Sequence, residues 1–70
     1  MTAIKLKNKY RGLWYDVYES MLEDLQFTMP KAEIEDYKSG NSHCRIIAIA
    51  YNAAFIACSE LDKRLMPISK

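Results

Sequence analysis

One apolar run near the C-terminus limits what this chain can fold into. It extends from Ile46 to Cys58 and contains one polar side chain, Asn52. On a helix with about 100° per residue, the polar positions of this region fall on one narrow line: Arg45, Asn52, Ser59 and Lys63. A helix that is apolar nearly all round is covered on several sides. We therefore predict a helix over 43–66 that other elements enclose.

This run is too short to cross a membrane. A span takes roughly 20 apolar residues, and charged residues flank the run closely on both sides. The start of the chain also lacks the apolar core of a signal peptide. Cys44 and Cys58 lie too far apart along one predicted helix to form a disulfide. We expect a cytoplasmic protein with free thiols and no membrane contact.

Two further segments carry helical signals. From Tyr10 to Phe27, apolar residues recur every three or four positions, and acidic residues share the opposite face. Pro30 favours a helix start and Gly40 suits the left-handed position after a helix, so a short helix is predicted over 30–38. Thr28 and Asn41 or Ser42 are candidate helix caps. The fold class is therefore all-α, with one domain over 1–70.

Residues 1–9 form a basic segment whose structure is open. Polar and apolar residues alternate with period two over 2–8, which indicates a short strand. A strand needs a partner, and the rest of the chain is predicted to be helical. The alternatives are a strand that pairs with its copy in a second protomer and a flexible N-terminal arm, the usual state of a terminus. Of these two, the arm is favoured.

Small residues on the 43–66 helix suggest how the core forms. They make a groove that lets another helix approach closely, and we expect Trp14, Tyr18 and Met21 to pack against Ala50, Ala54 and Ala57. The predicted arrangement is an antiparallel hairpin of two long helices with a short connecting helix. One hairpin covers too little of two long apolar stripes, so we predict a homodimer that forms a four-helix-like bundle. The predicted dimer face consists of Ile46, Ile49, Ala53 and Ile56.

Charge is divided among three blocks, of which the last, residues 38–70, has a formal charge of +3. Residues 1–11 carry four cations, and residues 12–37 carry seven acids against Lys31, for a formal charge of −6. Three of the acids form a row on the outer face of the 10–27 helix and are candidate contacts for a basic partner: Asp16, Glu19 and Glu23. The four cations at the start are candidate contacts for nucleic-acid phosphates: Lys5, Lys7, Lys9 and Arg11.

The sequence offers no clear catalytic constellation. His43 is the only histidine and precedes Cys44, but neighbours on a helix point about 100° apart, and no third group is placed to orient them. A metal site needs three or four ligands. We assign no catalytic, cofactor-binding or metal-binding residue and expect no cofactor.

We expect a small non-enzymatic intracellular adaptor, inhibitor or regulator that binds other proteins as a homodimer. The alternative is a dimeric DNA-binding transcriptional regulator that uses the basic N-terminal segment.

Overall fold

The computed structural model describes residues 2–65, and this range contains four helices and no strand. The helices are α1 (Ala3–Lys9), α2 (Arg11–Thr28), α3 (Lys31–Lys38) and α4 (Arg45–Leu65). The all-α class is therefore confirmed, as are the two long helices and the short one between them. The predicted end of the last helix, at Met66 and Pro67, lies outside the described residues.

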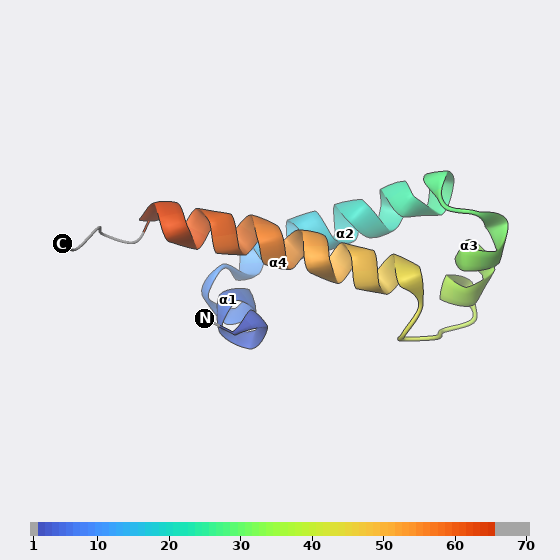
Figure 1. Cartoon of the computed structure of the whole chain (residues 1–70), viewed down its shortest axis with the longest axis horizontal. Coiled ribbons are helices and arrows are strands. Elements are labelled where there is room, and N and C mark those ends of the chain that lie inside the picture. The colour runs from blue at the N-terminus through green and yellow to red at the C-terminus, as the bar shows by residue number, and fades with distance from the viewer. Residues whose placement is uncertain (1, 66–70) are drawn as a thin grey trace.

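The two long helices determine the shape of the molecule. Figure 1 shows α2 and α4 side by side and running in opposite directions, with α3 at one end of the pair. Helix α1 turns back beneath α4 and contacts both long helices. The principal extents are 49 × 19 × 18 Å. Such a thin rod has long side faces, and α1 covers part of one of them.

The N-terminal segment is a helix, and both sequence-based alternatives for it were wrong. The Thr2 hydroxyl caps α1 by accepting a hydrogen bond from the backbone N–H of Lys5 at 3.3 Å. Leu6 is 2% exposed, whereas Ile4 is 69% exposed. A strand would have placed these two side chains on one face, but the helix turns them apart. The packing of Leu6 therefore decides the structure of this segment.

The core lies along one row of α4, where every fourth residue is fully buried: Ile46, Ala50, Ala54 and Cys58. The two alanines let α2 approach closely. Trp14 is 2% exposed and packs in one cluster with Ala54, Cys58 and Leu6. This confirms the predicted contact between Trp14 and the alanine groove.

The other predicted core contacts are divided between two clusters. Tyr18 packs against the cluster that contains Trp14 and Ala54. Met21 instead packs against a second cluster, which consists of Leu25, Cys44 and Ile46. The first cluster lies beside α1, which contributes Leu6, and the second lies beside α3, whose Ile34 and Tyr37 pack against it. Each end of the rod thus has its own apolar centre.

The connection between α3 and α4 has the predicted glycine turn. Gly40 has a φ of 91°, the left-handed region that glycine adopts without strain. The Asn41 side chain accepts a hydrogen bond from the backbone N–H of His43 and donates to the Asp36 carboxylate, both at 3.0 Å. Thr28 does not cap α3, because it ends α2 and donates its hydroxyl hydrogen bond to the carbonyl of Asp24.

Candidate functional site

The side of α4 that points away from the buried row is the first candidate surface. We call it the outer face of α4; it is made by Arg45, Ile49, Asn52, Ala53, Ile56 and Glu60. Ile56 is 59% exposed, and Ile49 and Ala53 are half-buried. The polar members Arg45, Asn52 and Glu60 are exposed. Apolar side chains in contact with water therefore lie between charged ends.

One predicted member of the dimer face does not belong to this surface. Ile46 has no exposed area and packs with Leu25 and Cys44 inside its own chain. It lies on the buried row that contacts α2, so a second copy cannot reach it in this conformation. The outer face thus retains Ala53 and Ile56 from the predicted set, together with the half-buried Ile49, which also packs against the cluster that contains Ile46.

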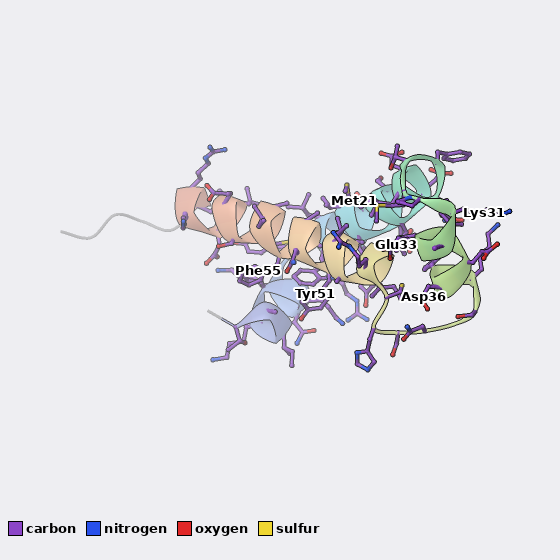
Figure 2. The ribbon with its side chains drawn as sticks, turned by 45° about the vertical axis from the view of Figure 1, so that its right-hand side comes forward. Met21, Lys31, Glu33, Asp36, Tyr51 and Phe55 are labelled. Atoms are coloured by element: carbon purple, nitrogen blue, oxygen red, sulfur yellow. The ribbon has the colours of Figure 1, made fainter. Side chains whose placement is uncertain are left out.

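The opposite side of α4 is partly covered by the chain itself. Figure 2 shows Tyr51 and Phe55 on the side of α4 that faces α1. The rings of Trp14 and Tyr51 meet edge to face, with centroids 5.2 Å apart. Phe55 packs against the cluster that contains Leu6. Helix α1 therefore covers this flank in part, and Tyr51 remains 41% exposed.

The acidic row on α2 is placed as the helical pattern predicts. Asp16, Glu19 and Glu23 are all exposed, and together with Ser20 they border a shallow hollow that is open to solvent. All four belong to one face of a single helix, on the side remote from the apolar residues that contact α4. The arrangement is a negative surface without apolar walls.

The four N-terminal cations do not act as one group. The Lys7 ammonium and the Arg11 guanidinium, from α1 and α2, each lie 5.9 Å from the centre of the Tyr15 ring. Lys9 instead forms an ion pair with Asp62, with 3.0 Å between Nζ and Oδ1. Lys5 is exposed. The charge of Lys9 is thus balanced inside the molecule.

The contact of Lys9 with Asp62 belongs to a site that the sequence analysis missed. Asp62 is buried, and its Oδ1 accepts hydrogen bonds from the Tyr10 hydroxyl at 2.6 Å and from Lys9. This carboxylate joins the end of α1 to the last turns of α4. A signal was present, because Asp62 continues the four-residue spacing of Ala54 and Cys58. An acid at a buried position needs partners.

These contacts shift the pKa of each group involved. The hydrogen bond from Tyr10, followed by that from Lys9, lowers the pKa of Asp62 from its ordinary value of 3.8. The hydrogen bond with Asp62 also raises the pKa of Tyr10 and that of Lys9. Around neutral pH, the Asp62 carboxylate is therefore negative, the Lys9 ammonium is positive and the Tyr10 hydroxyl is neutral. These charge states maintain the contacts between the end of α1 and the last turns of α4.

The histidine is exposed to solvent, whereas both thiols are buried. His43 is exposed, whereas Cys44 beside it is buried, and both cysteines are free. Burial raises the pKa of the Cys58 thiol, which makes it less reactive. Within residues 2–65, no three side chains of His, Cys, Asp or Glu are grouped to hold a metal ion.

No family model, no curated protein and no solved structure matches this chain. None of the helices in residues 2–65 combines the length and the apolar character that crossing a bilayer requires.

Acid is expected to weaken the link between α1 and α4. A folded-state pKa of Asp62 below its unfolded value stabilises the fold above about pH 4, and this contribution is lost as pH falls through the lower, folded-state pKa. Urea unfolding at about pH 7 and about pH 2 should therefore show a larger loss of unfolding free energy in the wild type than in Asp62→Asn. The exposed control Asp16→Asn should keep the wild-type difference. Equal losses in Asp62→Asn and the wild type would contradict this role.

Proposed function

We propose that this chain is a non-enzymatic intracellular binding protein that acts as a homodimer, as an adaptor or regulator. The observation that carries the proposal is the outer face of α4, where Ile56 is 59% exposed beside Ile49 and Ala53. The other sides of this helix pack against α1, α2 and α3. An apolar strip on a helix that is otherwise well packed is typical of a surface that another molecule covers.

A second copy would supply the cover that this strip lacks. Burying an isoleucine side chain completely gains about 1.5–3 kcal/mol relative to leaving it exposed, and a symmetric contact counts each residue twice. These gains must exceed the entropy lost on association. Two hairpins of α2 and α4 joined in this way form a four-helix-like bundle, which adds the stability that a small domain often lacks.

The acidic row is the proposed contact for a further protein. Asp16, Glu19 and Glu23 are exposed on the side of α2 remote from its contact with α4. Covering the outer face of α4 therefore leaves the row accessible. A dimer would display two such rows, and a basic partner that contacts both would gain avidity.

Self-association is tested by sedimentation equilibrium at micromolar concentration. The wild type should have the mass of a dimer, and Ile49→Asp or Ile56→Asp should have that of a monomer, because a charge on this face would be buried without a partner. Phe27→Asp is the matched control, since Phe27 is 84% exposed near the end of α2. Circular dichroism shows that each variant is folded. A monomeric wild type would refute the proposal.

The acidic row is tested by charge reversal. Replacement of Asp16, Glu19 and Glu23 by lysine should abolish capture of a basic protein partner from the native host, because the attraction becomes repulsion. Thermal stability should change little, since the three side chains are exposed. The variant Asp24→Lys/Glu35→Lys, which changes exposed acids elsewhere, should capture the partner normally. Unchanged capture by the triple variant would exclude this surface.

DNA binding is the second candidate function, and the convergence of Lys7 and Arg11 beside Tyr15 favours it. Filter binding should then show affinity that falls steeply with salt, with a log–log slope of about −0.9 for each phosphate contacted. Lys7→Gln should weaken binding more than Lys9→Gln, because Asp62 already pairs with Lys9. An absence of binding at about 50 mM salt would exclude this function.

A further inference from the structure

The residues on the outer face of α4 follow a symmetric order. Arg45 lies near one end and Glu60 near the other, and both are exposed. Ile49 and Ile56 lie between them. In sequence, the isoleucines and the two charged residues share one midpoint, between Asn52 and Ala53. From Arg45 to Glu60, the face is therefore positive, apolar, small or amide, apolar and negative. Lys63, which lies on the line of Arg45 and Asn52, follows Glu60 by about one turn.

This order distinguishes two ways of pairing two copies. A parallel pair would place Arg45 opposite Arg45 and Glu60 opposite Glu60, which is unfavourable at both ends. An antiparallel pair about the shared midpoint places Arg45 opposite Glu60 of the second copy at both ends. It also places Ile49 opposite Ile56 of the second copy. A parallel pair would also place isoleucine opposite isoleucine, so the charged ends are what distinguishes the two orientations.

We propose that a second copy of this chain packs antiparallel on the outer face of α4, with a twofold axis between Asn52 and Ala53. This inference rests on the proposed homodimer and defines its orientation and register. The two intermolecular ion pairs lie at the ends of the contact, about 22 Å apart along the helix at a rise of 1.5 Å per residue. The two isoleucine pairs lie between them and exclude water from the centre.

The free chain leaves both charged groups available for this contact. Within the described residues, no ion pair involves Arg45. Glu60 pairs with Lys63 over 3.6 Å, and both side chains are mostly exposed, so this ion pair is readily exchanged. Asn52 lies beside the axis, where a single amide in an apolar contact helps to fix the register of two helices.

Charge exchange tests the orientation by sedimentation equilibrium. Arg45→Glu and Glu60→Arg should each weaken dimerisation by about tenfold, because two attractive pairs become repulsive. The double variant Arg45→Glu/Glu60→Arg restores both pairs and should dimerise like the wild type. An equimolar mixture of the two single variants should form mixed dimers of wild-type strength, because both ion pairs then have opposite charges. Such mixed dimers would show that each single variant is folded and able to dimerise.

The outcomes separate this inference from the function on which it rests. A wild type that is monomeric at micromolar concentration refutes the homodimer itself. A dimeric wild type whose double variant is as weak as the single variants, or whose single variants dimerise normally, overturns the antiparallel register alone. The variant Lys38→Glu, changed at an exposed cation on α3, controls for the change in net charge and should dimerise like the wild type.

Discussion

The close approach of α2 to α4 is the contact on which the rest of the molecule depends. Ala50 and Ala54 have no exposed area, and their small side chains leave room for Trp14 from α2. A larger residue at either position would push the helices apart, because protein interiors tolerate little extra volume. The position of Trp14 in turn provides the surface on which Leu6 of α1 packs. The packing of α1 therefore depends on the position of Trp14, which in turn depends on the close approach of α2 to α4.

The geometry of this contact also explains which structural features could be predicted from the sequence and which buried positions could not. Hydrophobic periodicity was enough to predict both long helices. The conformational preference of glycine was enough to predict the turn at Gly40. A helical wheel assumes that one fixed side of α4 is buried. The buried row instead follows four-residue steps from Ile46 to Cys58 and drifts round the helix, since such ridges are inclined to the axis by about 26°. At one end it buries Ile46, and at the other it reaches Asp62.

The structure of α1 could not be predicted from local pattern for a different reason. Residues 2–8 fit a strand by alternation and also fit a short helix with a Thr2 cap, so the local preferences are nearly balanced. Contacts with α4, which is distant in sequence, decide the outcome: Leu6 packs with Ala54 and Cys58, and Tyr10 donates a hydrogen bond to Asp62. The same contacts divide the basic segment, because Lys9 pairs within the chain while Lys5 remains exposed.

The two buried thiols have a consequence for how the molecule opens. Cys44 belongs to the apolar cluster near α3, and Cys58 belongs to the one near α1. A reagent reaches each sulfur only when the surrounding cluster loosens, and such local openings differ in free energy from one part of a protein to another. The chain therefore carries one native reporter at each end of its helix pair, and their rates of alkylation measure the two ends separately.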